Sequence, residues 1–475
     1  MPLVAGADCS TQSTKVLIVD TDDGRVVASG AASHPVEGER GARESNPREW
    51  QASVASALSQ SGRAAEVGAI SIGGQQHGLV VLDGAGQPLR KAPLWNDTRG
   101  AADAKGVVEA LGGPAATAQR VGSVLTSSFT VAHWAWLRRV EPATAAATRR
   151  VLLPHDYLNF CLTGAATTDR SDVSGTGWWS PVDESYALDV LDLPAVELDP
   201  ACLPEVVGPA QAAGQVTNQA AAHYGLRPGT PVACGAGDNA AGALALSFAP
   251  GEAALSLGTS GTVYAPADRP SADSTGTVAG FAGADGRYLP LACTLNATLA
   301  VDQVSQWLGL GREDVAPAGD VVFLPWLGGE RTPNAPTASG ALAGLRYGTD
   351  KRAVLQAAYD GLVATLLEAT AFLDQWAPQS PGAPLLLLGG GARGQAWQDT
   401  VRRLSGRPVL VVELSELVAY GAAVQAAALL TGEAPTEVAR RWGARRGALL
   451  GPLARDDEAL GRISAWRQSY LASLG

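Results

Sequence analysis

The sequence predicts an α/β protein that is built from two domains. Its 475 residues exceed what one hydrophobic core usually holds, since domains of roughly 100–250 residues are typical. Near the N-terminus, residues 6–18 form an apolar segment, a small hydroxyl-rich turn and a second apolar segment. The same pattern returns in residues 255–264, about 250 residues later, which indicates two related halves. We therefore expect domains at 1–245 and 246–475.

The first residues predict a small antiparallel sheet followed by a helix. Residues 3–32 alternate between apolar segments and turns, with a hairpin turn at Asp22–Gly24. A helix is expected over Asn46–Ser59, because asparagine is a favoured N-cap and Pro47 suits the first helical position. A strand at Val67–Ile72 follows.

The remainder of the chain alternates helices with short strands. Residues 101–225 are expected to be mainly helical, with loops at Pro154–Tyr157 and Ser171–Gly177. Near the C-terminus, the pattern predicts a strand at Leu385–Leu388, a helix that ends at Ser405 and a strand at Val409–Val412. This order is typical of α/β domains.

Composition and charge exclude several classes of protein. The net charge of −11 argues against nucleic acid or an anionic membrane as a partner. No apolar run approaches the ~20 residues that cross a bilayer, and Asp8 interrupts the N-terminal segment before it can resemble a signal peptide. The five cysteines lack C-x-x-C spacing, which predicts neither a disulfide framework nor a zinc site. We expect a cytoplasmic protein.

The stretch from Val232 to Val263 contains the strongest chemical signal. An apolar run at Pro231–Cys234 ends in a Gly-x-Gly turn that presents Asp238, and a carboxylate on a tight turn can take a proton from an alcohol. The turn Gly258–Gly261 contains only glycine and hydroxyl residues, whose backbone N–H groups can hold phosphate oxygens. Together these features suggest phosphoryl transfer to a hydroxyl. The alternative is an ordinary strand, turn and helix in which Asp238 is a cap.

Two further turns carry candidate functional residues. Asp8 ends an apolar strand beside a hydroxyl-rich turn, where it could hold Mg²⁺ through water or simply bond its own turn. Gln76 and His77 lie on a glycine-flanked turn after a strand, where a polyol could be hydrogen-bonded; a lone loop histidine is otherwise a surface residue. No Cys, Asp or Glu lies near His77 at metal-ligand spacing, so a metal role is not expected there.

A rival hypothesis comes from the segment Gly389–Gly394. It contains G-x-G-x-x-G after a predicted strand, and Glu413 follows roughly 20 residues later, as in a dinucleotide-binding fingerprint. The protein would then be an NAD-dependent dehydrogenase. Against this, the segment lies near the C-terminus, and the hypothesis leaves Asp8, Lys15 and Asp238 without a role. Neither a P-loop nor a G-x-S-x-G elbow is present in the sequence.

Eight short motifs, taken in order, resemble the FGGY family of carbohydrate kinases. The resemblance extends from Asp8 to the helix after Gly391. The motifs are Gly6-x-Asp-x-Ser-Thr-x-x-x-Lys15, Gly74-Gln-Gln-His-Gly78, Trp95-Asn-Asp-x-Arg99, Ser171-Asp-x-Ser-Gly-Thr176, Gly237-Asp-Asn-Ala-Ala-Gly242, Leu257-Gly-Thr-Ser-Gly261, Gly329-Glu-Arg-Thr-Pro333 and Gly389-Gly-Gly-Ala-Arg393.

The resemblance implies two RNase H-like (actin-like ATPase) domains with a central cleft. The N-terminal domain, 1–245, would bind the sugar and carry catalysis, and the C-terminal domain, 246–475, would bind the nucleotide. The implied reaction transfers the γ-phosphoryl group of ATP, with Mg²⁺, to the 5-hydroxyl of D-xylulose. The alternatives are ribulose, fuculose, gluconate or glycerol as acceptor, or a non-catalytic sensor of sugar or nucleotide. A homodimer is the expected assembly.

The family's site residues carry over to matching positions. Asp238 is implied as the catalytic base and Asp8 as the organiser of metal and phosphate. The residues implied to contact the sugar are Gln76, His77, Asp238 and Asn239, with Trp95 and Asp97 nearby. The residues implied to bind ATP and its phosphates are Thr11, Lys15, Gly258, Thr259, Ser260, Gly390, Gly391, Ala392 and Gln395.

Overall fold

The structure is a computed structural model that describes residues 2–474 and divides into two compact units. The first unit takes the chain up to Ser247 together with Arg269–Leu289 and Glu416–Arg445. The second takes Phe248–Asp268, Pro290–Ser415 and the chain from Arg446. The chain thus returns twice to the first unit after Ser247, so the compact units are not separated by a single cut.

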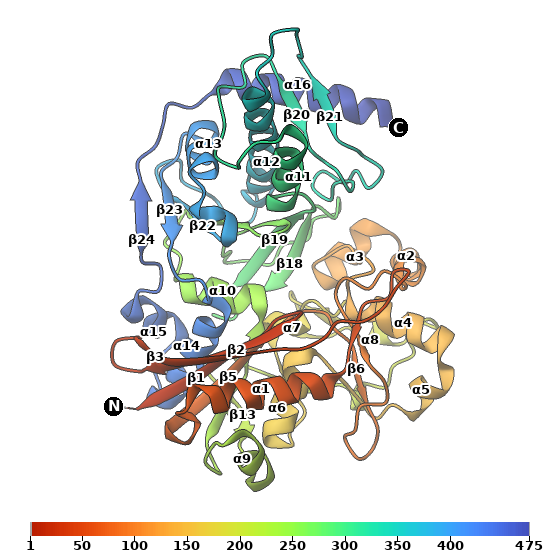
Figure 1. Ribbon diagram of the computed structural model, residues 1–475. Helices are drawn as coiled ribbons and strands as arrows, with labels where there is room; N and C mark the ends of the chain where they lie inside the picture. The colour runs from red at the N-terminus through yellow and green to blue at the C-terminus, as the bar shows by residue number, and fades with distance from the viewer. Residues whose placement is uncertain (1, 475) are drawn as a thin grey trace. The chain divides into compact units, whose positions relative to one another are not determined.

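The first unit is built on a mixed sheet in the order β13-β14-β5-β1-β2-β3, with β15 also paired to β5. Strands β1 and β2 are antiparallel, whereas β5 runs parallel to β1, β14 and β15. Figure 1 shows β1, β2 and β3 side by side at the N-terminal end of the colour scale. The strand bounds are Leu3–Cys9 (β1), Ser13–Asp20 (β2), Val26–Ser33 (β3), Val67–Gly74 (β5), Ala212–Gln215 (β13), Pro231–Ala233 (β14) and Ala236–Gly237 (β15).

Helices α1 (Pro47–Ser61) and α14 (Leu417–Thr431) pack against this sheet. The predicted start of α1 is confirmed, since the Asn46 side chain accepts a hydrogen bond from the N–H of Arg48 and Pro47 is the first residue. Helix α14 approaches β1 very closely, because a Cβ at Gly6 would lie 1.9 Å from the carbonyl oxygen of Ala419. Glycine is therefore required at position 6.

The rest of the first unit is mainly helical between residues 101 and 225, as predicted, with short strands between the helices. Pro154–Tyr157, predicted as a loop, is instead the first turn of α6; proline starts this helix, and the Asp156 side chain accepts from the N–H of Leu153. Part of the second predicted loop, Ser171–Val173, is also helical, because Asp169 caps α7.

The helices are α2 (Ala101–Ala110), α3 (Pro114–Val121), α4 (Thr130–Val140), α5 (Pro142–Ala147), α6 (Pro154–Thr163), α7 (Arg170–Val173), α8 (Leu188–Leu191), α9 (Asn218–Tyr224), α10 (Asp238–Leu246) and α15 (Pro435–Trp442); the short strands are β4 (Glu44–Ser45), β6 (Val80–Leu82), β7 (Ala92–Pro93), β8 (Arg150–Leu152), β9 (Thr167–Asp169), β10 (Trp179–Ser180), β11 (Ser185–Tyr186), β12 (Glu205–Val207) and β18 (Val278–Ala282).

The second unit has a sheet in which β19, β17, β16, β22, β23 and β24 follow one another. Strands β16, β22 and β23 are parallel, while β17 is antiparallel to β16 and to β19. The predicted strands β22 and β23 and the end of helix α13 at Ser405 are confirmed. The bounds are Ala253–Leu257 (β16), Gly261–Tyr264 (β17), Tyr288–Thr294 (β19), Val322–Leu324 (β20), Ala341–Ala343 (β21), Leu385–Leu388 (β22), Val409–Val412 (β23), Gly447–Leu450 (β24), Thr298–Leu308 (α11), Lys351–Leu373 (α12), Gln395–Ser405 (α13) and Asp457–Leu474 (α16).

The two sheets repeat one connection pattern. In the first unit, the hairpin β1–β2 is followed by the parallel neighbour β5; in the second, the hairpin β16–β17 is followed by the parallel neighbour β22. The predicted α/β class with two related halves is confirmed. Within residues 2–474 no single helix is long and apolar enough to span a membrane, and only the bent pair α14–α15 meets that test when both helices are combined.

Candidate active site

Three parallel strand ends meet in the first unit and bring the main candidate residues together. Asp8 on β1 lies opposite Gly73 on β5, and Gly237 on β15 lies opposite Gly74. Gln76 and His77 follow directly after β5, and Asp238 follows directly after β15. Ligands commonly bind outside the carboxyl ends of parallel strands in such sheets. The topology therefore collects these side chains at one edge of the sheet.

Asp8 is a buried carboxylate with few partners. Its side chain is 6% exposed, and both of its oxygens lie 2.7 Å from the hydroxyl of Ser10. Burial raises the pKa of Asp8 to about 6; the Ser10 hydrogen bond and the Lys15 charge oppose this rise, while the Glu416 charge adds to it. A divalent cation would stabilise the ionised form, so this carboxylate fits a metal.

The metal would take most of its other ligands from outside the protein. No group of three or more His, Cys, Asp or Glu side chains that could hold a metal occurs in residues 2–474. Mg²⁺ commonly binds through one or two carboxylates while retaining water and accepting phosphate oxygens. A single aspartate at position 8 is consistent with that coordination.

Asp238 is the first residue of α10 and remains partly accessible. Its Oδ1 accepts from the backbone N–H of Asn239 at 2.7 Å and from the Asn239 side-chain amide at 2.9 Å. Burial of the carboxyl group, followed by the charge of Asp8, raises the pKa of Asp238 to about 7, although the Asn239 hydrogen bonds oppose the rise. A carboxylate with a pKa near neutrality is suited to general-base catalysis.

Gln76 and Asn239 are joined beside this carboxylate. The amide Nδ2 of Asn239 donates to Oε1 of Gln76 at 3.0 Å. Gln76 is 5% exposed, and a Cβ at Gly237 would lie 2.8 Å from its side chain. The short residue at position 237 thus lets the two amides approach the same space as Asp238.

His77 adopts an unusual backbone conformation and has a fixed ring. Its φ is 69°, in the left-handed region, which is uncommon for a residue other than glycine. Its Nδ1 donates to the carbonyl oxygen of Gly175 at 2.7 Å, and its ring lies 5.2 Å from that of Phe129 and 5.5 Å from that of Phe281. A Cβ at Gly175 would lie 2.4 Å from the His77 Cε1 atom, so glycine is needed there.

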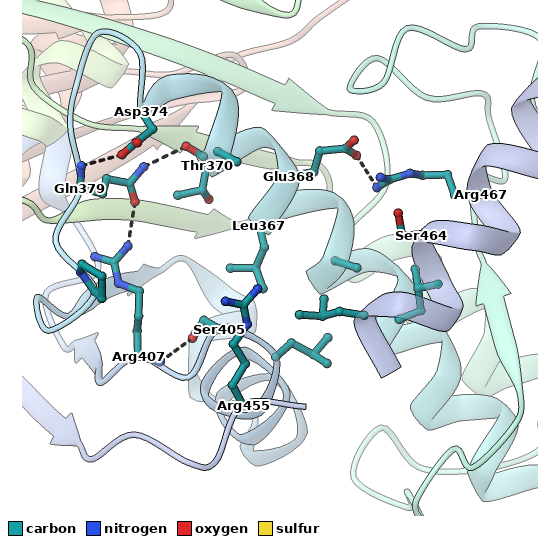
Figure 2. A pocket seen from close by; sticks show the side chains of 16 residues that line it. Leu367, Glu368, Thr370, Asp374, Gln379, Ser405, Arg407, Arg455, Ser464 and Arg467 are labelled. Atoms are coloured by element: carbon teal, nitrogen blue, oxygen red, sulfur yellow. Dashed lines mark hydrogen bonds and ion pairs between the residues drawn. The ribbon is translucent and has the colours of Figure 1, made fainter. Parts of the chain in front are cut away.

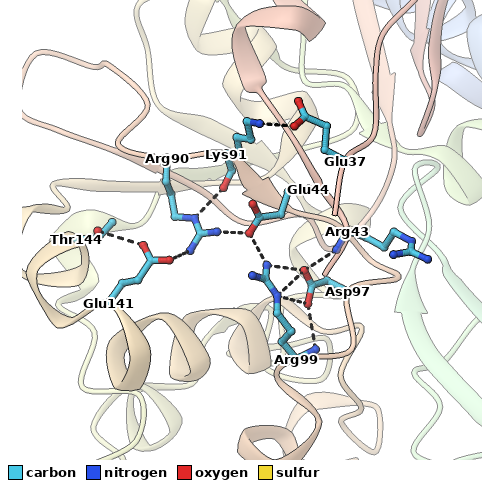
Figure 3. A network of polar contacts seen from close by, with 9 residues as sticks. All are labelled: Glu37, Arg43, Glu44, Arg90, Lys91, Asp97, Arg99, Glu141 and Thr144. Carbon is cyan, nitrogen blue, oxygen red and sulfur yellow. Dashed lines mark hydrogen bonds and ion pairs between the residues drawn. The ribbon is translucent and has the colours of Figure 1, made fainter. Parts of the chain in front are cut away.

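Two residues of the Trp95–Arg99 motif have different environments: Asp97 is buried and holds its loop, whereas Trp95 is exposed. Asp97 is 1% exposed and accepts hydrogen bonds from the backbone N–H of Arg43 and from the guanidinium of Arg99. Figure 3 shows Arg99 reaching from Asp97 to Glu44 within a wider ionic network. Asp97 therefore fixes its loop. Trp95 is 40% exposed, and its Nε1 donates to Thr11 Oγ1 at 3.1 Å.

Lys15 lies opposite Asp8 on β2 and pairs with Glu416, the residue before α14, at 2.8 Å. The sequence analysis missed Glu416. An acidic residue before an apolar helix marks a helix start, but its contact with a residue about 400 positions earlier leaves no local pattern. The electrostatic environment of Asp8 and Lys15 thus includes a group from the C-terminal part of the chain.

In the second unit, the two predicted nucleotide-binding turns are neighbours. Gly258, Thr259 and Ser260 are exposed and connect β16 to β17. Gly389 follows β22, which is parallel to β16; its φ is 83°, and a Cβ there would lie 2.6 Å from the carbonyl oxygen of Leu257. The glycine turn after β22 thus packs directly on the end of β16.

The residues after Gly389 differ in exposure. Gly390 is exposed, whereas Gly391 and Ala392 are buried. Gln395, at the start of α13, is exposed and donates from Nε2 to Asp399 at 2.8 Å. A 3-10 helix at Gly390–Arg393 separates β22 from α13, so the strand does not run directly into the α-helix as a dinucleotide fingerprint requires.

A pocket of about 540 Å³ in the second unit has no predicted site residue in its lining. Figure 2 shows Arg467 paired with Glu368 and Arg407 bonded to Gln379. Arg407 also donates to the backbone carbonyl groups of Ala383 and Gly251. The Arg467 and Arg407 guanidinium groups are thus already engaged by protein atoms.

A carboxylate with a pKa near neutrality, beside amide and imidazole groups, is equipped to activate an alcohol, and exposed glycine turns are of the kind that hold phosphate. The site therefore fits a phosphotransferase that acts on an alcohol. The chain belongs to the FGGY family of carbohydrate kinases: residues 3–245 match the N-terminal domain of the family and residues 253–430 match its C-terminal domain. Family membership decides against the dehydrogenase hypothesis.

Individual relatives cover nearly the whole chain. The chain is 57% identical to the xylulose kinase of Streptomyces coelicolor over 98% of its own length and 95% of that protein. It is 32% identical to the xylulose kinase of Haemophilus influenzae, with 89% of each chain covered. The crystal structure of xylulose kinase from Bifidobacterium adolescentis has a TM-score of 0.86 and 31% identity, covering 98% of this chain and 99% of that one.

Proposed function

We propose that this kinase transfers the γ-phosphoryl group of ATP to the 5-hydroxyl of D-xylulose. The observation that carries the proposal is the 57% identity to a xylulose kinase over 98% of the chain. The first-unit geometry supports it, because a carboxylate suited to deprotonating an alcohol lies among polar groups that can orient a sugar.

Asp238 is the proposed general base. The two Asn239 hydrogen bonds fall on Oδ1, so we assign Oδ2 the proton of the sugar hydroxyl. Phosphoryl transfer depends on positioning and on charge stabilisation, and the base completes it by accepting this proton. The pKa of about 7 lets Asp238 be ionised before the reaction and hold the proton after it.

Gln76, His77 and Asn239 are the proposed sugar contacts. Two amides and an imidazole offer both donors and acceptors, as hydroxyl groups require. Their fixed orientation, set by the Asn239–Gln76 bond and the His77–Gly175 bond, supports selection among sugars by hydroxyl geometry.

Asp8 is proposed to hold Mg²⁺, and Lys15 to stabilise the transferring charge. When bound, Mg²⁺ neutralises charge on the phosphate oxygens. Lys15 is paired with Glu416, and a phosphate would compete with that carboxylate for its ammonium group. The proposed phosphate contacts of the turns are made by Thr11, Gly258, Thr259 and Ser260, and the proposed adenosine contacts by Gly390, Gly391, Ala392 and Gln395.

The test is a panel of acceptors in a coupled assay of ADP release, with D-xylulose, D-ribulose, L-fuculose, gluconate and glycerol. We expect the highest kcat/KM for D-xylulose. Preference for another acceptor would overturn the substrate assignment. If no acceptor caused ADP release although calorimetry showed sugar binding, the protein would be a sensor rather than a kinase.

The location and assembly of the enzyme complete the proposal. We assign sugar binding and catalysis to a domain at 1–245 and nucleotide binding to a domain at 246–475. We place the protein in the cytoplasm, where ATP is found and thiols stay reduced; the five cysteines, all within residues 2–474, form no disulfide. A homodimer is proposed, and light scattering on the purified protein would test it.

A further inference from the structure

A fully buried ionic cluster lies in the first unit beneath the proposed sugar contacts. His155 and Asp156 belong to the first turn of α6, Asp169 ends β9 and Asp172 lies in α7. The side chains of all four are at most 3% exposed. None of them belongs to the set of substrate-binding residues assigned above.

The imidazole of His155 lies between three carboxylates. Its Nδ1 is 2.7 Å from Oδ2 of Asp172, and its Nε2 is 3.2 Å from Asp156 and 3.6 Å from Asp169. Burial favours the neutral ring, but the charge of Asp156 and the Asp172 interaction outweigh it and raise the pKa of His155 to about 10. His155 is therefore a buried cation at neutral pH, and Asp172 is its closest partner.

Two of the three carboxylates have local structural roles. Asp156 accepts from the N–H of Leu153 and begins α6, and Asp169 accepts from the N–H groups of Ser171 and Asp172 and caps α7. The carboxylate of Asp172, in contrast, faces away from its own helix toward His155. Its contacts are tertiary ones.

Asp172 links this cluster to His77. Its carbonyl oxygen accepts the N–H of Gly175 at 2.9 Å. Gly175 in turn accepts from the His77 ring at 2.7 Å. The ring of His77, whose backbone is left-handed, is thus held by the segment 172–175.

The same cluster contacts the elements on either side of the site. A Cβ at Gly74, the last residue of β5, would lie 2.9 Å from the Cβ of His155, and one at Gly235 would lie 2.6 Å from its Cδ2. The Ser171 hydroxyl accepts from the N–H of Gly237, the residue before Asp238. A displaced His155 would therefore disturb the backbone that carries the sugar contacts.

We propose that the His155–Asp172 pair is a positioning pair that fixes His77 and so sets the affinity of the enzyme for its sugar, without touching sugar or nucleotide. The inference rests on the proposed role of His77 in sugar binding. The buried His155–Asp172 contact holds the segment 172–175 in place, and Gly175 of that segment holds the His77 ring. Loss of either partner frees His77 to relax, which lowers sugar affinity more than it changes the phosphoryl transfer itself.

The test compares His155→Gln, which retains a donor without the charge, with His155→Lys, which restores the charge, and with Asp172→Asn. For His155→Gln and Asp172→Asn we expect the KM for the sugar to rise about tenfold or more, with kcat and the KM for ATP within about twofold of wild type. We expect His155→Lys to recover most of the sugar affinity. Calorimetric titration of each variant with sugar in the absence of ATP measures the change in sugar affinity without turnover.

Asp156→Asn is the matched control, because Asp156 contacts the same imidazole but lies outside the segment 172–175 that holds the His77 ring. It is expected to alter the melting temperature while the sugar KM stays within about twofold of wild type, since only the Asp172 route reaches His77. Unchanged sugar affinity in folded His155→Gln and Asp172→Asn would overturn the inference, as would equal increases of both KM values. If wild type itself does not phosphorylate D-xylulose, the proposed substrate is wrong, and the sugar that wild type does accept is used for the comparison.

Discussion

The hairpins β1–β2 and β16–β17 occupy equivalent places in their sheets but carry side chains of different chemistry. Each is followed in the sheet by a parallel strand, β5 or β22. The first hairpin carries Asp8, a buried carboxylate held by Ser10. The second has no carboxylate in its turn, and Gly258, Thr259 and Ser260 are exposed.

This difference teaches how one backbone motif can serve two purposes. A buried carboxylate is destabilised by desolvation, so it attracts a cation or a proton. An exposed turn of glycine and hydroxyl residues offers neutral donors, which suit an anion without adding charge. Under the proposed function, the first unit supplies ionisable groups and the second supplies a neutral turn for phosphate. Variants on each side should consequently change different kinetic constants.

The largest effect on catalysis is expected from substituting an ionisable residue of the first unit. Asp238→Asn removes the proposed base while retaining the size and the Asn239 contact, so kcat should fall about a thousandfold with ATP affinity preserved. Stopped assays of sugar phosphate and calorimetry with ATP measure the two quantities. Asp199→Asn changes an exposed aspartate of the same unit and should leave kcat unaltered. A variant Asp238→Asn with near-normal turnover would refute the base assignment.

The second expected effect is a dependence of kcat/KM on pH, which arises from Asp238 in the first unit. Because the pKa of Asp238 is raised to about 7, the base is protonated below that pH and ionised above it. The kcat/KM for D-xylulose should therefore rise through pH 7 and fall about tenfold per unit on the acidic side. A midpoint near pH 4 in the pH–rate profile would show that burial does not perturb this carboxyl group.

How far the sequence predicts this arrangement differs between residues. Asp8, Gln76 and Asp238 were each singled out because each comes at the end of an apolar strand, and the family resemblance implied that they share a site. In the structure the ends of these parallel strands meet at one edge of the sheet. The glycine and hydroxyl turn at Gly258–Ser260 was recognisable from composition alone. Strand and turn chemistry is local, so it can be detected in a single sequence.

The contacts of His155, Asp172 and Glu416 could not be predicted in the same way, although Asp172 stands in one of the motifs that resemble the family. His155 stands in a segment that was expected to be a loop, and its partner Asp172 belongs to a separate helix. Glu416 meets Lys15 only after the chain returns to the first unit. Ion pairs between distant segments depend on packing, and no local periodicity reports them.

The smallest effect is expected from substituting a residue of the neutral turn at Gly258–Ser260 in the second unit. Thr259→Val removes one hydroxyl from an exposed turn but keeps its shape, and one neutral hydrogen bond contributes about 1 kcal/mol. The KM for ATP should rise about fivefold while the KM for D-xylulose stays unchanged. Thr262→Val lies in β17 of the same hairpin, where valine is well tolerated, and should change neither constant. If Thr259→Val instead raised the sugar KM or removed activity, the second hairpin would be doing more than holding phosphate, and the division between a charged and a neutral unit would fail.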